Sequence, residues 1–217
     1  GDVGKKLFAK LETKGVMGLT FWDNGFKQMS ANRPLINVAD FKGLKMRIQS
    51  SKVLDATMKA LGANPQVMAF SEVYTGLQQG VVDGTENPVS NFYTQKMNEV
   101  QKHMTISQHG YLGYAVIVNK KFWEGLPADV RTALEAAMKE ATVFERTIAQ
   151  QENDEALAKV KGAKATEIHY QSPKERLEWY KALLPVHKEF ESVIGQDIIQ
   201  AVYATAAQVE KEHLAKK

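Results

Sequence analysis

The chain has 217 residues, of which 44% are hydrophobic and 24% charged, and its formal net charge is only +3. Lysine and arginine are mixed with aspartate and glutamate along the chain, which argues against a nucleic-acid-binding stripe. The sequence contains no cysteine, which excludes disulfides and thiolate metal sites, and no apolar run approaches the roughly 20 residues of a membrane span.

The N-terminal part of the chain predicts a helix followed by short strands. A helix is expected over residues 5–14 and an apolar strand over residues 16–22. The tripeptide Asp23-Asn24-Gly25 is a turn signal and predicts a loop directly after this strand. A short helical turn over residues 40–43 is expected to lead into the next strand.

That next strand is predicted over residues 45–49. Met46 and Ile48 alternate with polar residues, so one face of the strand is expected to be apolar and the other polar. This alternation places Arg47 on a rigid element while its neighbours pack.

The strand opens a strand-helix-strand-helix unit. Ser51 is placed to cap a helix that Gly62 ends, a second strand is predicted over residues 66–69, and a second helix over residues 70–80. Such a unit predicts a parallel sheet with a right-handed crossover. In such sheets small ligands bind beyond the strand ends, near helix N-termini.

The rest of the chain predicts one long strand and one unusually long helix. A helix continuous over residues 129–161 would be roughly 50 Å long at 1.5 Å per residue, which exceeds a small lobe and predicts that the helix braces two. The tail over residues 211–217 is polar and expected to be frayed. The other expected elements are a helix over 88–96, a strand over 104–118, a short helix over 120–125, a strand over 166–170, a helix after 172 and a helix around 198–203.

Several linked motifs resemble the DctP family, the extracytoplasmic solute-binding proteins of TRAP (tripartite ATP-independent periplasmic) transporters. They lie at residues 24–28, 43–47, 68–88, 99–102 and 126–127, so the resemblance extends over nearly the whole chain. It implies an α/β fold of the periplasmic-binding-protein-like, two-lobed, type II-like kind, with a long helix that spans both lobes.

The resemblance also implies a division into lobes. Residues 1–22 and 113–150 are expected to be a remnant of lobe I and the interlobe helix, and residues 23–112 and 151–217 to form lobe II with the carboxylate-binding motifs. Family members carry a secretion signal and much of lobe I before the segment around Trp22. We therefore expect most of lobe I and the signal peptide to be absent from this chain, and the full-length protein to be periplasmic.

Three residues are candidates for contacting an anionic ligand. The guanidinium of Arg47 offers paired donors that match a carboxylate, whereas without its motif Arg47 would be read as a structural or surface arginine. The resemblance implies the carboxylate-clamping role. Asn87 follows an expected loop over Gly84-Thr85-Glu86 and reads as a helix cap from its position before Pro88. The resemblance implies an amide donor to the same carboxylate. Lys27 reads as a solvated lysine, and the resemblance implies a second cationic contact where many relatives carry arginine.

Other residues are expected to line or support this site. Trp22 and Phe70 are packing residues first, and Phe70 is expected to form one wall of the ligand slot. Glu72 and Glu86 are poor partners for a carboxylate, so we expect them, with Gln49, to orient the cationic groups or backbone amides from a second layer.

The sequence gives little support to metal binding or catalysis. None of the five histidines has metal-ligand spacing, and we expect neither a metal nor a cofactor. His109 lies near the expected crossing between lobes, where a ligand contact, a hinge role and a structural role all stay open. Asp83 and Glu86 as a general acid–base pair would be the enzyme interpretation.

The leading hypothesis is therefore a binding protein that captures a small organic acid and docks on TRAP membrane subunits. Residues 22–27, 47–52 and 108–114 are most similar to binders of four-carbon dicarboxylates, for which succinate, fumarate and malate are the expected ligands. Binders of sialic, keto and aromatic acids share the motif around Arg47. A sensor or adaptor and, less favoured, an enzyme on a similar scaffold are the alternatives.

Overall fold

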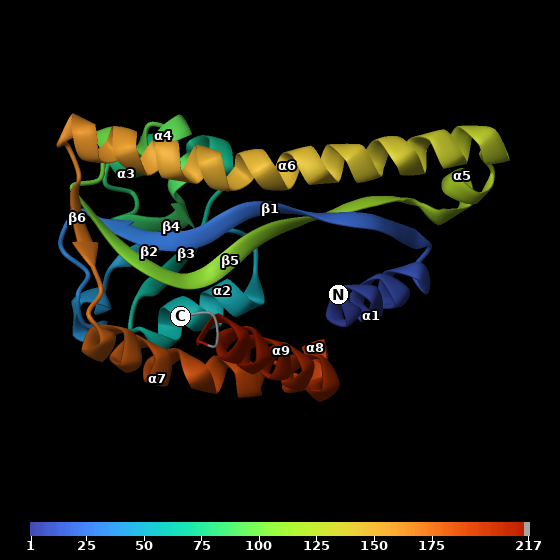
Figure 1. The fold of residues 1–217 in the computed structure, drawn as a ribbon. Coiled ribbons are helices and arrows are strands. Elements are labelled where there is room, and N and C mark those ends of the chain that lie inside the picture. Colours follow the sequence, from blue (N-terminus) through green and yellow to red (C-terminus); the bar gives the residue numbers. More distant parts are fainter. Residues whose placement is uncertain (215–217) are drawn as a thin grey trace. The chain divides into compact units, whose positions relative to one another are not determined.

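The computed structural model describes the backbone of residues 1–214 and the side chains of residues 1–212. The end of the predicted frayed tail, residues 215–217, lies outside this part. Figure 1 shows the elements in chain order: α1 (Asp2–Glu12), β1 (Val16–Ala31), η1 (Val38–Phe41), β2 (Lys45–Ile48), α2 (Lys52–Ala60), β3 (Asn64–Val67), η2 (Phe70–Glu72), α3 (Val73–Gln78), β4 (Gly84–Pro88), α4 (Val89–Thr94), η3 (Met97–Glu99), β5 (His103–Asn119), α5 (Lys120–Glu124), α6 (Ala128–Ala163), β6 (Glu167–Tyr170), α7 (Pro173–Glu189), α8 (Glu191–Ile194) and α9 (Gln196–Leu214).

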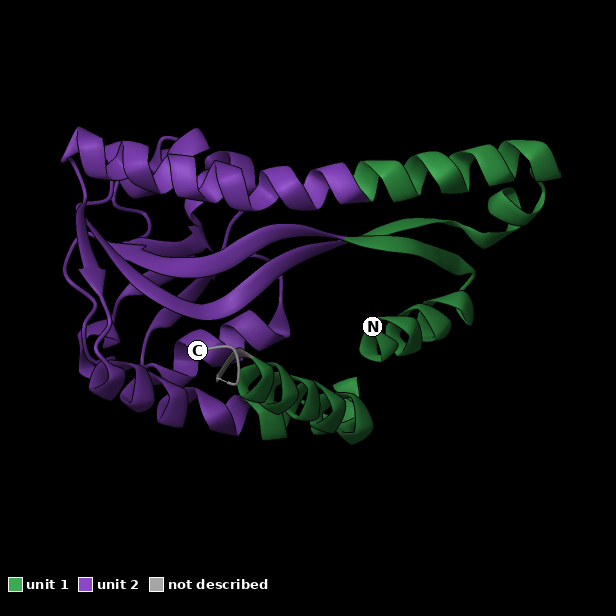
Figure 2. Cartoon of the chain, viewed as in Figure 1, with its two compact units in different colours: residues 1–21, 115–142, 187–217 green, residues 22–114, 143–186 purple. Residues whose placement is uncertain are grey.

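The chain divides into two compact units (Figure 2). Unit 1 comprises residues 1–21, 115–142 and 187–217, and unit 2 comprises residues 22–114 and 143–186. The elements β1, β5, α6 and α7 each contribute residues to both units. The lobe boundaries expected from the family resemblance stay a prediction.

In unit 1, aromatic and charged side chains hold the N-terminal helix. The rings of Phe8 and Phe21 stack with their centroids 4.3 Å apart. Lys10 Nζ donates a hydrogen bond to the carbonyl oxygen of Ile194 (3.2 Å), at the end of α8. These contacts attach α1 to β1 and to the C-terminal helices.

The sheet has six strands in the order β3-β2-β4-β1-β5-β6. The strand β2 pairs in parallel with β3 and β4, β4 pairs antiparallel with β1, and β5 pairs in parallel with β6. The parallel pairing of β2 and β3, which are consecutive in the sequence and joined by α2, confirms the predicted strand-helix-strand unit.

The boundaries of α2 confirm the predicted signals. Ser51 is the N-cap, and its hydroxyl oxygen accepts a hydrogen bond from the amide of Leu54 (3.3 Å). Gly62 follows the helix with a φ of 84°, a left-handed conformation that glycine adopts without strain. The next strand, β3, begins at Asn64, two residues earlier than the sequence predicted.

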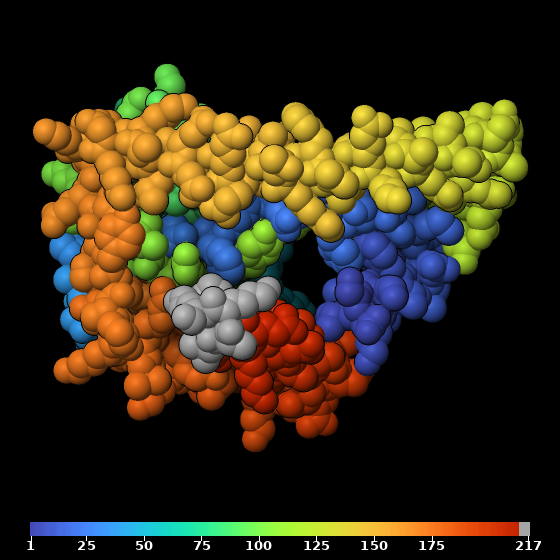
Figure 3. Space-filling model, viewed as in Figure 1, coloured from blue at the N-terminus to red at the C-terminus, as the bar shows by residue number. Residues whose placement is uncertain are grey.

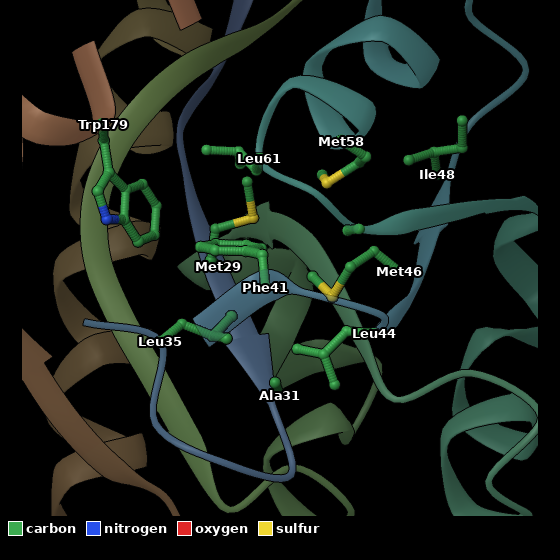
Figure 4. Packing of buried hydrophobic residues seen from close by; sticks show 11 residues of the cluster. Met29, Ala31, Leu35, Phe41, Leu44, Met46, Ile48, Met58, Leu61 and Trp179 are labelled. Atoms are coloured by element: carbon green, nitrogen blue, oxygen red, sulfur yellow. The ribbon is translucent and has the colours of Figure 1, made fainter. Parts of the chain in front are cut away.

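Two hydrophobic cores stabilise unit 2. Within this unit, Figure 1 shows α2 and α7 on one face of the sheet and α3, α4 and α6 on the other. The first core is built around Phe41, Met46 and Trp179, and Figure 4 shows its packing. Phe41 and Trp179 meet edge to face, with ring centroids 4.9 Å apart. The second core includes Phe92 and Val160. The outer side of α7, in orange in Figure 3, lies at the molecular surface.

The predicted loop at residues 23–25 is wrong, because β1 runs without a break from Val16 to Ala31. The Asn153 side chain of α6 donates a hydrogen bond to the carbonyl oxygen of Asn24 (2.6 Å). At Gly25 a Cβ would lie 2.8 Å from Asn153 Nδ2, and the backbone has a φ of 153°. Glycine is therefore required here by the close approach of α6 rather than by a turn.

The loop expected at Gly84-Thr85-Glu86 is also wrong. These residues form β4, which is buried at all five positions. A Cβ on Gly84 would lie 2.4 Å from the carbonyl oxygen of Ser30, so glycine allows β4 and β1 to approach each other.

The long helix is confirmed as one continuous element. The 36 residues of α6 correspond to roughly 54 Å at 1.5 Å per residue. Its residues 128–142 belong to unit 1 and its residues 143–163 to unit 2. No helix in the described part of the chain is both long and apolar enough to span a membrane.

Candidate functional site

The candidate residues meet at the carboxyl end of β4, in unit 2. Arg47 lies opposite Thr85 in the register of β2 and β4, and directly opposite residues point to the same face of a sheet. Asn87, two residues further on, shares that face. Glu86 points to the other face, together with Lys27, which pairs with Pro88 in the register of β1 and β4. The structure thus forms two clusters, one on each face of β4.

The first cluster, which we call the Arg47 cluster, consists of Arg47, Met68, Phe70, Thr85 and Asn87. Arg47 is 2% exposed, and its Nε and Nη2 atoms both donate to the carbonyl oxygen of Met68 (3.0 and 2.9 Å). Its Nη1 atom is buried and has no hydrogen-bond partner among the described residues. The Cζ atom lies 5.7 Å from the centroid of the Phe70 ring.

Burial governs the electrostatics of Arg47. Desolvation lowers the pKa of the Arg47 guanidinium, and the negative charge of Glu86 acts in the opposite direction. Burying a guanidinium with an unpaired donor costs free energy, because the hydrogen bond that this donor makes to water is lost and not replaced. An anion that binds Nη1 would replace it.

Asn87 does not cap the following helix, so the helix-cap interpretation is wrong. Pro88 is the N-cap of α4, with no side-chain cap hydrogen bond. Asn87 is 4% exposed, and its Nδ2 atom donates to Thr85 Oγ1 (3.2 Å) and lies 3.7 Å from Met97 Sδ. The sulfur is a weak acceptor, so this amide keeps donor capacity for a stronger partner.

The second cluster, the Glu86 cluster, consists of Lys27, Glu86, Ser107 and His109. Lys27 Nζ lies 2.6 Å from Glu86 Oε1, and His109 Nε2 lies 3.4 Å from Glu86 Oε2. Ser107 Oγ lies 2.7 Å from His109 Nδ1. The side chains of Lys27, His109 and Glu86 are 7%, 5% and 1% exposed, so the solvated-lysine interpretation of Lys27 is wrong.

Glu86 is held as a carboxylate despite its burial. Desolvation alone raises the pKa of Glu86, but the hydrogen bond from His109 and the positive charge of Lys27 outweigh it and leave this pKa below its ordinary value. Glu86 thus compensates the charge of Lys27, and this pair contrasts with the open donor of Arg47.

The other predicted residues lie outside the two clusters. Trp22 is half-buried in β1, five residues before Lys27, which is roughly 17 Å along an extended strand. Gln49 is half-buried and directly follows β2, whereas Glu72 is exposed at the end of η2. Asp83 accepts a hydrogen bond from the amide of Lys45 (2.8 Å) near the opposite end of β4, which gives an acid–base pair with Glu86 no support.

Sequence reasoning missed two supporting residues. Gln28 Oε1 accepts hydrogen bonds from the amides of Ser107 and Gln108 (2.9 and 3.1 Å), and so fixes the backbone just before His109. Ser107 holds the imidazole itself. The position of Gln28 beside Lys27 was a usable signal, but its partners are some 80 residues away in the chain and no local pattern identifies them.

A separate cavity of about 230 Å³ lies in unit 2, between β1, α4 and α6. Three carboxylates line it, those of Asp23, Glu145 and Glu152, next to Tyr114 and Ile148. An acidic lining repels a carboxylate, so this cavity does not suit an anionic ligand. Within the described side chains, no group of three or more His, Asp or Glu residues is arranged to hold a metal ion.

Comparison with known proteins gives consistent matches. The family model described as bacterial extracellular solute-binding protein, family 7 (DctP), matches residues 1–193. The C4-dicarboxylate-binding periplasmic protein DctP of Rhodobacter capsulatus is 64% identical over 208 residues, which cover 96% of this chain and 62% of that protein. The chain thus spans less than two thirds of the length of this relative.

Two solved structures share the fold. A TRAP periplasmic solute-binding protein from Shewanella oneidensis with bound succinate has a TM-score of 0.91 and 41% identity, over 94% of this chain and 67% of that one. The sugar-acid-binding protein DctPAm from Advenella mimigardefordensis, in complex with galactonate, has a TM-score of 0.90 and 32% identity, over 96% and 67% of the two chains.

Proposed function

The chain belongs to family 7 of the bacterial extracellular solute-binding proteins, the DctP family, and from this premise we propose that it binds a small organic acid without converting it. Arg47 and Asn87 hold a carboxylate of the ligand, and Phe70 forms one wall of the site. Lys27 and His109 lie within reach of the rest of the ligand, with Glu86 behind them.

One observation carries this proposal: the buried Nη1 atom of Arg47 has no hydrogen-bond partner among the described residues. The Nε and Nη2 atoms of Arg47 both donate to the carbonyl oxygen of Met68, and these two hydrogen bonds fix the orientation of the guanidinium and of its Nη1 atom. A carboxylate oxygen is the strongest partner for such a donor. The amide of Asn87, on the same face of the sheet, supplies a second donor.

The ligand class that we propose is a C4-dicarboxylate such as succinate, fumarate or malate. Relatives named for C4-dicarboxylate binding and a succinate-bound structural neighbour support it. We assign the second carboxylate to Lys27, whose position on the opposite face of β4 from Arg47 supports a contact around the end of the strand.

We further propose that the protein acts in the periplasm, after export by a signal peptide, and delivers its ligand to the membrane subunits of a TRAP transporter. The names of periplasmic relatives support the location. In this proposal residues 1–22 and 113–150 belong to lobe I and the interlobe helix, and residues 23–112 and 151–217 form lobe II.

A monocarboxylate such as a sugar acid is the second candidate ligand. The galactonate-bound neighbour motivates it, and so does the pairing of Lys27 with Glu86, which leaves Arg47 as the one uncompensated cation of the two clusters. Hydroxyl groups of a sugar acid could use the polar atoms of the Glu86 cluster in place of a second carboxylate.

Titration calorimetry with the full-length protein tests the proposal. Succinate, butyrate and galactonate are titrated into the parent and into Arg47→Lys, which keeps the charge but loses the planar fork. We expect the parent to bind succinate best and Arg47→Lys to lose at least tenfold in affinity for every acid it binds. Binding of no acid, or equal affinities for parent and variant, would contradict the proposed role of Arg47.

A further inference from the structure

We propose that His109 takes up a proton when a dicarboxylate binds, and that this proton sets the preference for diacids over monoacids. This inference rests on the proposed function and concerns the same site. It follows from the charges of the two clusters and from the hydrogen bonds of the imidazole.

The two clusters together carry too little positive charge for a diacid. Glu86 cancels one of the two charges of Lys27 and Arg47, so the buried groups carry one net positive charge while His109 is neutral. A monocarboxylate matches that charge. A dicarboxylate would leave one negative charge uncompensated among side chains that are almost fully buried, which is unfavourable in such surroundings.

His109 can supply the missing charge without losing a partner. Because Glu86 is a carboxylate, it accepts only, so the proton of neutral His109 lies on Nε2 and the Ser107 hydroxyl donates to Nδ1. When His109 gains a proton, Nδ1–H donates to the Ser107 oxygen, which accepts equally well. The same two neighbours therefore satisfy the imidazole in both charge states.

The added proton also changes what Lys27 can do. Lys27 Nζ has three N–H donors, and Glu86 Oε1 takes one of them. A protonated His109 shares the negative charge of Glu86 through Oε2, so Glu86 compensates less of the charge on Lys27. Lys27 is then free to attract the second carboxylate of the ligand.

The charged groups that act on His109 come from three strands, two of them through Glu86. Glu86 on β4 contacts it directly, Lys27 on β1 acts through Glu86, and Arg47 on β2 interacts with Glu86 electrostatically. Lys27 and Arg47 oppose the proton, while Glu86 and the incoming dianion favour it. Histidine is the side chain whose charge changes near neutral pH.

Calorimetry in two buffers measures this proton directly. Succinate is titrated into the protein as its gene encodes it, in phosphate and in Tris at pH 7.5, and the difference between the apparent enthalpies gives the number of protons taken up. We expect uptake approaching about one proton for succinate and none for butyrate, and a succinate affinity that falls as pH rises from 6 to 8.5. Butyrate affinity should stay level over that range.

His109→Gln separates the proton from the hydrogen bonds, because glutamine still donates to Glu86 but cannot become charged. We expect this variant to lose the proton uptake and to weaken succinate at least tenfold more than butyrate. The matched control is His103→Gln, another histidine of β5 that faces a glutamate, Glu167 at 3.4 Å, outside both clusters. It should leave the uptake unchanged.

The outcomes distinguish the two proposals. If the parent binds no acid, the proposed function is wrong. If it binds succinate with no proton uptake, or if His109→Gln takes up as many protons as the parent, the proposed function stands and the role of His109 is wrong.

Discussion

Each face of β4 carries a buried cation, and the two cations differ in whether they are paired with a carboxylate. On one face Arg47 is 2% exposed and its buried Nη1 atom has no hydrogen-bond partner among the described residues, while on the other Lys27 is 6% exposed and held 2.6 Å from a carboxylate. The two cations lie on β2 and β1, the strands on either side of β4, and belong to one unit.

The difference separates binding from stability. An unpaired buried donor lowers the stability of the fold, and an anionic ligand that binds it offsets this cost. A cation that is paired with a carboxylate has its partner before any ligand binds. We therefore expect changes at Arg47 to act mainly on affinity and the loss of one charge from the Lys27–Glu86 pair to act mainly on folding. Four experiments test this contrast.

The largest effect is expected for Glu86→Gln. It leaves Lys27 buried without its counter-charge, which should lower the free energy of unfolding by about 3–5 kcal/mol in urea denaturation. The double variant Lys27→Met/Glu86→Gln removes both charges and should regain most of that loss. An exposed pair serves as control: Asp55→Asn breaks the contact with Lys59 on α2 and should cost below about 1 kcal/mol.

Arg47→Met should produce the reverse pattern. Methionine fills much of the same space without a charge to desolvate, so the unfolding free energy without ligand should change by less than about 1 kcal/mol. Succinate affinity should fall by about 2 kcal/mol or more, or at least 30-fold, by calorimetry. Arg33→Met is the matched control, because this exposed arginine also donates to backbone carbonyls but lies outside both clusters. A large loss of stability in Arg47→Met with intact binding would reverse the assignment.

The pH dependence of stability sharpens the contrast further. The fold lowers the pKa of Glu86 below 4.5, so its ionised form stabilises the native state above the unfolded-state value, and this contribution is lost as the pH falls through the lowered pKa. The gap in unfolding free energy between the parent and Glu86→Gln should thus narrow as the pH falls below 4.5. A gap that widens on acidification would show that the sign is wrong.

The smallest effect is expected for Ser51→Ala. It removes the N-cap of α2 and should cost about 1 kcal/mol of stability. The helix packs on the face of the sheet that carries Met46 and Ile48, so Arg47 keeps its surroundings. Affinity for succinate should be unchanged. A matching loss of affinity would mean that any destabilisation weakens binding, and the contrast between the two faces would lose its basis.

What could be predicted from the sequence was encoded locally. The cap at Ser51, the helix end at Gly62 and the continuous helix over residues 129–161 were predicted from patterns within a few turns of chain, and each is confirmed. The parallel pairing of β2 and β3 followed from the connection between them. The family resemblance directed attention to Arg47.

What could not be predicted depends on partners far away in the chain. Asn24 and Gly25 read as a turn, but Asn153, some 129 residues later, holds them in a strand. Lys27 was predicted to be solvated, but it is buried and paired with Glu86, which lies 59 residues later in the chain. Gly84 reads as a loop residue although it lies where two strands approach closely. In each case the prediction followed a local sequence preference, whereas a tertiary contact decides the structure.

The burial of β4 has a consequence for the entropy of binding. All five of its residues are buried, and strands on both sides hold its backbone. Thr85, Glu86 and Asn87 are thus fixed before a ligand arrives, so their backbone loses little conformational freedom when the ligand binds. Their amide hydrogens should be among the slowest of the chain to exchange with solvent. A site of this kind can bind a very small molecule tightly, since few of its contacts are offset by the ordering of the protein.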